Sequence, residues 1–309
     1  MVNEDVLVGL DVSDDAAVYR INDDLAIVAT VDFFTPIVDD PYSFGAIAAA
    51  NSLSDIYAMG GRPILALNVA ALSDKVPLDV SAEILRGGAE KAREAGILIA
   101  GGHTVRDEEP KYGLVALGAI DPARLTRKGG AIPGDRLLLS KPLGAGVVTT
   151  GLMRDTAEPS EVEAATASMM RLNAAAAEVA QAVGSSAVTD ITGYGLLGHA
   201  SEMSQRGEVG FSIRYGDLPW LPGAERLGAT MTFPGGAYDN RRHFGSLVEF
   251  DESLEDWQQI LCFSPETSGG LLMAVRASRA DDALGAAAEA GVDLADIGEV
   301  VAAPGIRVL

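Results

Sequence analysis

The sequence predicts two domains, each mixing α-helices with β-strands in an α+β arrangement. The chain has 309 residues, of which 48% are hydrophobic and 22% charged, and this length suggests about two domains of ~150 residues. In both halves, apolar runs of strand length alternate with Ala-rich runs of helical periodicity. Residues 121–135 contain two prolines, two consecutive glycines and several basic residues, as a linker does. We therefore predict domains at 1–122 and 123–309.

The elements of the first half follow from periodicity and breakers. An apolar, β-rich run at 25–31 predicts a strand that ends at Asp32. Apolar positions recur at helical spacing over 42–59, and Gly60-Gly61 ends that pattern. Asn51 and Asp55 are four residues apart in this helix, so they share one face. Further strands are expected at 64–72, 97–100 and 112–120, and a further helix at 80–95.

The second half repeats the mixture. An Ala-rich segment predicts one long helix over 160–183, and a short strand at 187–190 ends at Asp190. A glycine-rich turn at 193–195 then leads into a helix that reaches residue 205. The remaining expected elements are strands at 136–140, 211–215, 246–250, 271–275 and 298–301, and a helix at 280–290.

Composition restricts the partners and the location. The net charge is −21, which disfavours nonspecific binding to nucleic acid or anionic membranes because both depend on basic patches. No apolar run reaches the ~20 residues that span a bilayer, and the first residues lack the pattern of a secretory signal. We therefore expect a cytoplasmic protein that uses neither nucleic acid nor membrane. The single cysteine, Cys262, excludes a disulfide within the chain and is expected to pack in a core.

Aspartates flanked by small or apolar residues are the main functional signal. They are Asp14-Asp15, Asp32, Asp55 and Asp190. Each has a structural alternative: a turn for the first pair, a strand-end cap for Asp32, and a helix N-cap for Asp190. Asp55 resists such an explanation, because aspartate is a poor interior helix residue. Burying a carboxylate without a partner costs free energy, so together they favour Mg²⁺ bound to a phosphate.

Glycine-rich segments give a second, less specific signal. Gly101-Gly102-His103-Thr104 follows an expected strand, and backbone N–H groups in such a loop could hold phosphate oxygens. Neither this segment nor 193–195 matches a P-loop or a dinucleotide-binding fingerprint. Segment 234–242 could offer basic groups to an anion, but it is equally consistent with a solvated basic loop. Segment 264–272 could be simply a turn that enters a strand. The histidines are too scattered for a zinc site, and His199 is expected to be a satisfied core histidine.

Several of these segments, taken in order, closely resemble the selenophosphate synthetase (selenide, water dikinase) family of the aminoimidazole ribonucleotide synthetase-like superfamily. The specific runs are Ala-Ala-Asn-Ser-Leu-Ser-Asp-Ile-Tyr-Ala-Met-Gly-Gly (49–61) and Thr-Asp-Ile-Thr-Gly-Tyr-Gly-Leu-Leu-Gly-His (189–199). Shorter runs at 14–19, 31–39, 100–104 and 264–272 extend the resemblance over essentially the whole chain.

The resemblance implies a fold, a reaction and a set of site residues. It implies a homodimer joined through the N-terminal sheets, with an α+β C-terminal domain, that converts ATP, selenide and water into selenophosphate, AMP and orthophosphate. It implies Mg²⁺ ligands and a nucleotide site with a part that could reach across the dimer. The implied metal ligands are Asp15, Asp32, Asp55 and Asp190; Asp32, Asn51, Asp55, Gly101, Gly102, His103 and Thr104 would bind the nucleotide.

The chain departs from the family pattern at its start. The family carries a glycine-rich segment with a reactive cysteine or selenocysteine followed by Gly-Cys-Lys, and no residue here matches that segment or its lysine. We therefore assign no catalytic residue within this chain. We expect the chain to bind Mg²⁺-ATP and to form little selenide-dependent AMP. Truncation, a start called after a selenocysteine codon, or natural loss would each explain the difference. The alternative functions are another ATP-using synthetase or small-molecule kinase, and a non-catalytic nucleotide-binding paralogue.

Overall fold

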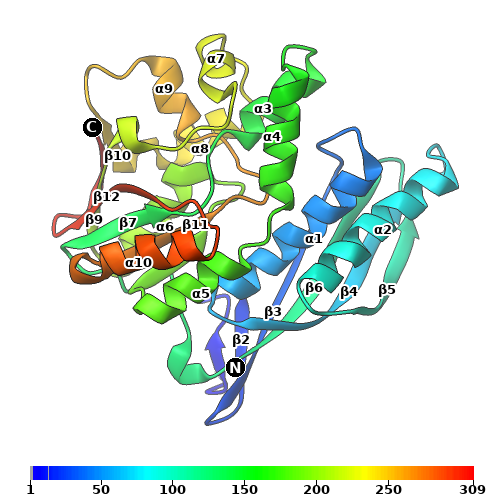
Figure 1. The fold of residues 1–309 in the computed structure, drawn as a ribbon, viewed down its shortest axis with the longest axis horizontal. Helices are drawn as coiled ribbons and strands as arrows, with labels where there is room; N and C mark the ends of the chain where they lie inside the picture. Colours follow the sequence, from blue (N-terminus) through cyan, green and yellow to red (C-terminus); the bar gives the residue numbers. More distant parts are fainter. Residues whose placement is uncertain (1–2, 13) are drawn as a thin grey trace. The chain divides into compact units, whose positions relative to one another are not determined.

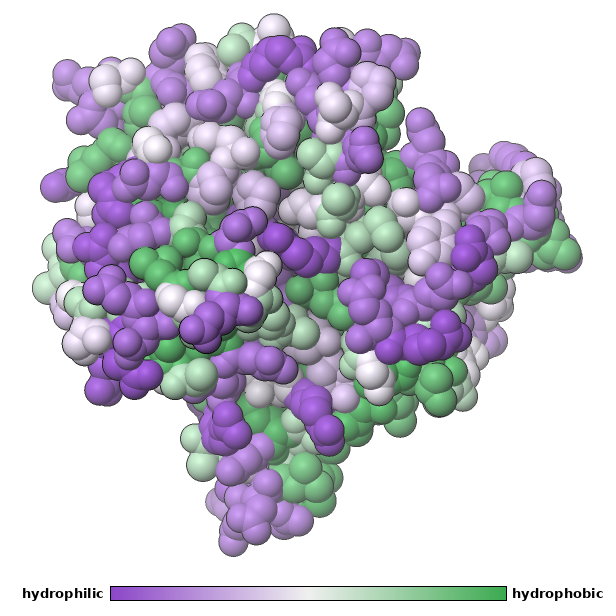
Figure 2. Space-filling view, viewed as in Figure 1, coloured by the Kyte–Doolittle hydropathy of each residue, from purple (hydrophilic) through white to green (hydrophobic). Residues whose placement is uncertain are grey.

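A computed structural model describes residues 3–12 and 14–309, which form two compact units. The first unit runs to Leu125 and also includes Met170–Ala174. The second consists of Thr126–Met169 and Ala175–Leu309. Each contains one β-sheet with helices packed on it, which confirms the predicted mixture of helices and strands. Figure 2 shows hydrophilic residues over much of the surface in view, with hydrophobic residues in smaller groups among them.

In the described residues, the first unit has a six-stranded sheet in the order β1-β2-β3-β6-β4-β5. Neighbouring strands are antiparallel except β4 and β5, which are parallel. Helices α1 and α2 lie on one face of this sheet (Figure 1). The elements are β1 (Val6–Val8), β2 (Ala17–Asn22), β3 (Leu25–Phe34), α1 (Pro41–Ala58), β4 (Arg62–Leu72), α2 (Leu78–Glu94), β5 (Ile99–Arg106) and β6 (Lys111–Ile120), followed by a 3-10 turn at Pro122–Arg124.

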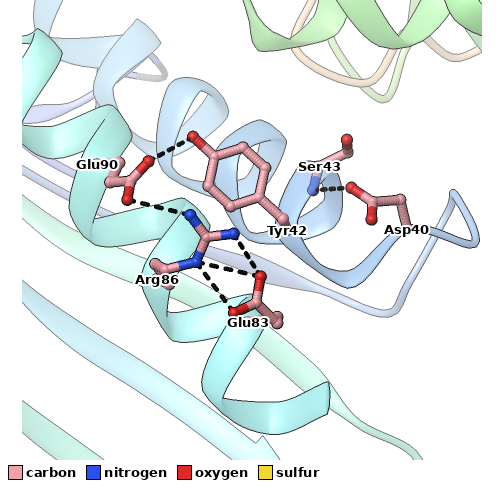
Figure 3. A network of polar contacts seen from close by, with 6 residues as sticks. All are labelled: Asp40, Tyr42, Ser43, Glu83, Arg86 and Glu90. Carbon is pink, nitrogen blue, oxygen red and sulfur yellow. Dashed lines mark hydrogen bonds and ion pairs between the residues drawn. The ribbon is translucent and has the colours of Figure 1, made fainter. Parts of the chain in front are cut away.

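The start of α1 is defined by its cap and by contacts with α2. Asp40 accepts a hydrogen bond from Ser43 N at 2.8 Å, and Pro41 occupies the first turn, where its missing N–H is harmless. Tyr42 donates to Glu90, and the Arg86 guanidinium lies 4.4 Å from the centre of the Tyr42 ring (Figure 3). These contacts orient α1 along α2, and with it the α1 residues that face the sheet.

Glycines allow the two helix backbones to touch. A Cβ atom added at Gly45 in α1 would lie 1.9 Å from the carbonyl oxygen of Ile84 in α2. One added at Gly87 in α2 would lie 2.0 Å from the carbonyl oxygen of Tyr42. No side chain fits such distances from backbone, so this close approach requires glycine at both positions.

The second unit has, in its described residues, a seven-stranded sheet in the order β10-β13-β9-β12-β7-β11-β8. Its strands are β7 (Asp135–Leu139), β8 (Ala187–Asp190), β9 (Gly210–Ile213), β10 (Val248–Phe250), β11 (Leu271–Arg276), β12 (Ala295–Val301) and β13 (Gly305–Val308). Its helices are α3 (Ala145–Met153), α4 (Pro159–Met170), α5 (Ala174–Val183), α6 (Gly195–Gly207), α7 (Ala224–Ala229), α8 (Gly235–Phe244), α9 (Asp256–Leu261) and α10 (Ala277–Glu289).

The main core of the second unit lies between this sheet and α6. Leu137 and Leu139 of β7 contribute to it together with Leu197 and Met203 of α6. Cys262 is 1% exposed within the same core, which confirms its predicted packing role, and burial raises the pKa of its thiol. Strand residues of the opposite parity point to the other face, where α10 contacts β7 and β11.

Among the differences from the sequence-based prediction, three arise from contacts between distant residues. Strand β3 continues past Asp32 to Phe34, since its pairing with β6 extends to Tyr112. Gly101–Thr104 is part of strand β5 rather than a loop, because it pairs in parallel with β4. The predicted helix over 160–183 is two helices, α4 and α5. The buried Asn173 at their junction donates to Ser54 Oγ at 2.8 Å.

No helix within residues 3–12 and 14–309 combines the length and the apolar character needed to cross a membrane.

Candidate functional site

Alternate residues of β3 contact one face of α1. Thr30, Asp32 and Phe34 are two residues apart, so they point to the same side of the sheet. Thr30 Oγ1 donates to Asp55 Oδ2 at 2.5 Å, and Asn51 Nδ2 donates to Asp32 Oδ2 at 2.9 Å. The Phe34 ring packs edge-on against Phe44, with their centres 5.9 Å apart. Alternate residues of β3 therefore contact residues of α1 that lie on one helix face. The carboxylates of Asp32 and Asp55 lie together in this contact layer.

Asp55 and its neighbour Asn51 are among the few polar side chains buried in α1. Asp55 is 8% exposed and Asn51 is 6% exposed. Their spacing of four residues places both on the α1 face that β3 contacts, as the sequence predicted. Asn51 donates to the carboxylate of Asp32, and Thr30 donates to that of Asp55.

Two residues of this layer escaped the sequence analysis. Thr30 precedes Asp32 by two positions, and the period of a strand was the signal that could have identified it. Ser52 is fully buried, and its Oγ lies 3.0 Å from the carbonyl oxygen of Asp32 and accepts from Leu114 N at 3.1 Å. Ser52 therefore ties α1 to both β3 and β6 at the level of the carboxylates.

Asp15 lies on the wall of a cavity in the same unit. The cavity has a volume of about 610 Å³ and is bordered by Asp14, Asp15, Thr30 and apolar residues of β2, β3 and β6. Asp14 Oδ1 accepts from Asp15 N at 3.0 Å, so Asp14 takes part in a local turn. The cavity connects Asp15 to Thr30, which in turn contacts Asp55.

Asp190 ends β8 in the second unit and is 2% exposed. The N-cap of α6 is Tyr194, not Asp190, so the alternative N-cap role is wrong. The chain stays extended after β8, because Ile191 N donates to Gly270 O at 2.8 Å and keeps this segment beside 264–270. Within the described part of the chain, Asp190 Oδ2 is buried and accepts no hydrogen bond. A buried carboxylate oxygen in that state is expensive, and a bound cation would offset the cost.

Gly101, Gly102, His103 and Thr104 lie at the edge of the first sheet, far from the two carboxylates of the same chain. Their strand, β5, is three strand spacings from β3, roughly 14 Å. All four residues are exposed. Gly102 has φ +144°, and a Cβ atom there would lie 2.3 Å from Asn68 O. The strand therefore needs glycine where it bulges against β4.

The carboxylate oxygens of the aspartates suit a hard cation, but the described residues do not form a preassembled group of metal ligands. Among residues 3–12 and 14–309, no three His, Cys, Asp or Glu side chains gather into a group that could hold a metal ion. Mg²⁺ commonly binds through one or two carboxylates and takes its other ligands from phosphate and water. The orphaned Asp190 oxygen and the all-oxygen set of aspartates fit Mg²⁺ held together with a phosphate ligand.

A buried glutamate near Asp190 was also missed. Glu266 is 3% exposed, and its carboxylate accepts from Gly144 N at 2.6 Å and Ala145 N at 2.8 Å at the N-terminus of α3. Burial raises the pKa of Glu266 to about 8. The hydrogen bonds from these two N–H groups lower the pKa, but their effect is smaller than that of burial. The sequence signal was the segment 264–272, which was open to interpretation as a turn. Glu266 N donates to Thr192 O at 2.9 Å, two residues after Asp190.

Comparison with known proteins agrees with this architecture. Family models named AIR synthase related protein match residues 13–120 (N-terminal domain) and 133–309 (C-terminal domain). The fold is shared with a solved structure of AaThiL complexed with AMPPCP and TMP, at a TM-score of 0.73 and 19% identity. That match covers 97% of this chain and 88% of the other.

Closer sequence relatives are curated proteins named selenide, water dikinase. One from Carboxydothermus hydrogenoformans is 49% identical over 94% of this chain and 85% of its own length. Another, from Myxococcus xanthus, is 47% identical over 98% of this chain and 87% of its own length. Identity of this extent, over both domains, shows common family membership. The chain therefore belongs to the selenide, water dikinase family of enzymes, within the AIR synthase related proteins.

Proposed function

We propose that this protein uses ATP with Mg²⁺ to make selenophosphate from selenide and water, releasing AMP and orthophosphate. The observation that carries the proposal is the layer formed by β3 and α1. There, Asn51 contacts Asp32 and Thr30 contacts Asp55, in a chain nearly half identical to selenide, water dikinases. The solved relative with AMPPCP supports a nucleotide in this fold.

The roles of the chain's own residues follow from their chemistry. Bound Mg²⁺ would neutralise phosphate charge and align the phosphates for transfer. In the first unit, Asp32 and Asp55 of the β3–α1 layer and Asp15 beside the adjoining cavity would serve as Mg²⁺ ligands. In the second unit, Asp190 at the end of β8 would serve as a Mg²⁺ ligand. Asn51 orients Asp32 by donating to Oδ2. With a net charge of −21, the protein needs such ions to offset its repulsion of ATP.

Nucleotide products test this proposal directly. A polypeptide of residues 1–309 is expected to bind ATP in calorimetry only when Mg²⁺ is present. It is expected to form little AMP with selenide, because no residue matches the family's Cys/Sec-Gly-Cys-Lys segment. Adding a Cys-Gly-Cys-Lys segment in front of residue 1 is expected to raise selenide-dependent AMP. Release of ADP without AMP that depends on an added amine or phosphate ester would instead indicate a small-molecule kinase. Binding without any turnover in both forms would indicate a non-catalytic paralogue.

We also propose that the chain forms a homodimer through the sheet of its first unit. Val31 and Phe33 of β3 and Val105 of β5 point away from α1 and α2, on one face by their register. They are 53%, 51% and 51% exposed. His103 pairs with Val69 in the row that contains Phe33, so it shares this face. A partner subunit on this face would bury the apolar side chains and bring residues 101–104 towards a second nucleotide site.

The homodimer gives a prediction about mass in solution. Phe33→Asp is expected to shift the protein from twice 32.0 kDa to 32.0 kDa in light scattering, because it places a charge in the proposed interface. Leu78→Asp is the matched control: Leu78 is 84% exposed at the start of α2, away from this face, and the dimer is expected to persist. Circular dichroism checks that both variants fold. A dimer that survives Phe33→Asp would contradict this interface.

A further inference from the structure

A chain of polar contacts runs from a buried lysine to the turn that follows Asp190. Lys128 is 5% exposed, and its Nζ lies 3.0 Å from Glu202 Oε2. The same oxygen lies 3.2 Å from Nδ1 of His199, which is 5% exposed. Nε2 of His199 lies 3.2 Å from Thr192 Oγ1. All four residues belong to the second unit, so the chain of contacts is internal to it.

The carboxylate of Glu202 lies beside Nδ1, the ring nitrogen of His199 that does not face Thr192. Burial acts to raise the pKa of Glu202, but contacts with His199 and Lys128 outweigh it and bring the pKa to about 2. Glu202 is therefore an anion near neutral pH. Its contact with Nδ1 is electrostatic, because Nδ1 has no hydrogen-bond partner among the described residues, and a nearby negative charge favours a proton on that nitrogen. In the tautomer with the proton on Nδ1, Nε2 accepts the hydrogen bond of the Thr192 hydroxyl. Metal-site histidines are oriented by carboxylates in a similar way, although here His199 contacts a threonine.

Thr192 connects the turn that follows Asp190 to neighbouring segments through its backbone and its side chain. Its carbonyl oxygen accepts from Glu266 N at 2.9 Å and from Gly195 N at 2.9 Å. Its side chain contacts His199 from α6. Thr192 thus connects three parts of the second unit: the segment after β8, the segment that carries Glu266, and α6. Two residues before it, the buried Asp190 Oδ2 accepts no hydrogen bond within the described residues.

We propose that His199 is a positioning residue that, through Thr192, holds the backbone after Asp190 in place for cation binding. The metal part of this inference rests on the proposed function, whereas the hold on Thr192 does not. A core histidine that only fills space would need neither Glu202 nor Thr192 at its ring nitrogens. The ring also lies 5.4 Å from that of Tyr194 in the same turn, so His199 contacts this segment on two sides.

Hydrogen exchange in the ligand-free 309-residue protein tests the hold on Thr192. His199→Leu removes the acceptor, and the amides of Gly195 and Glu266, which donate to Thr192 O, are expected to exchange about tenfold faster. His199→Gln extends an amide oxygen towards the place of Nε2 and is expected to keep exchange near that of the wild type. The control Ser201→Ala changes another buried side chain of α6, whose Oγ donates to Leu197 O within the same helix, and is expected to leave these amides unchanged.

Calorimetric binding of Mg²⁺-ATP tests the consequence for the cation. His199→Leu and Thr192→Val are each expected to raise the Mg²⁺ concentration for half-saturation about tenfold, the effect typical of lost outer-shell partners. Because both remove the same contact, the double variant is expected to show no more than the larger single effect. His199→Gln is expected to restore at least part of the loss, which a purely space-filling residue would not do.

The two measurements separate the failure of this inference from that of the proposed function. A wild-type protein that binds no Mg²⁺-ATP would overturn the proposed function and the metal role of His199 with it. Wild-type binding with an unchanged half-saturation in His199→Leu and Thr192→Val would overturn the metal role alone. Unchanged exchange at Gly195 and Glu266 in both variants would overturn the hold on Thr192. If His199→Leu fails to fold, Thr192→Val still decides the outcome.

Discussion

Replacing Asp55 with asparagine is expected to abolish magnesium-dependent ATP binding. Asparagine has nearly the same size and can still accept the hydrogen bond that Thr30 donates to Asp55 in the wild-type chain, so α1 keeps its place against β3. The negative charge is lost, and with it a proposed Mg²⁺ ligand. Losing outer-shell partners alone costs about 10- to 100-fold in metal affinity, so we expect the Mg²⁺-ATP dissociation constant to rise by more than about 100-fold.

Calorimetry with ATP, with and without Mg²⁺, measures this effect. The matched control is Asp24→Asn, an exposed aspartate in the turn between β2 and β3, where binding is expected to stay unchanged. Thermal unfolding of both variants checks that the loss of binding is not a loss of fold. If Asp55→Asn binds Mg²⁺-ATP like the wild type, Asp55 is not a metal ligand and its burial in α1 has another cause.

The second large effect concerns the close contact between α1 and α2. Gly45→Ala adds a methyl group where the carbonyl oxygen of Ile84 lies 1.9 Å away, so the helices must separate. Overpacking of this kind lowers the free energy of unfolding by about 1–3 kcal/mol. We expect the urea midpoint of the first unit to fall accordingly. Since α1 carries both Asn51 and Asp55, Mg²⁺-ATP binding is expected to weaken in the same variant.

A second glycine-to-alanine substitution, at an open position in another helix, distinguishes the effect of overpacking from that of helix propensity. Gly285 lies inside α10, and a Cβ atom added there meets nothing within 4 Å. Gly285→Ala is therefore expected to raise stability by about 0.5–1 kcal/mol, as alanine does in an open helical position. Equal effects of the two substitutions on urea unfolding, in size and sign, would contradict a tight α1–α2 contact.

Local patterns predicted those elements whose boundaries depend on their own residues. The apolar spacing of α1 and the Gly60-Gly61 stop lie close together in sequence, so the helix was predicted to within one residue at each end. Strand β8 was predicted to the residue, at Ala187–Asp190. The helix over 160–183 and the loop at 101–104 were wrong because Asn173 contacts Ser54 and β5 pairs with β4. Partners distant in sequence leave no trace in a local pattern.

The sequence by itself determined the mixed two-domain organisation, the family and the choice of Asn51 and Asp55 as partners on one helix face. These follow from periodicity and from motifs of contiguous residues. Only the tertiary structure showed that Thr30 and Ser52 belong to the carboxylate layer, that Glu266 joins the start of α3 to the segment after Asp190, and that His199 contacts Thr192. The physical reason is that a hydrogen bond depends on distance in space. Strand pairing and helix packing create that proximity, and no spacing along the chain encodes it.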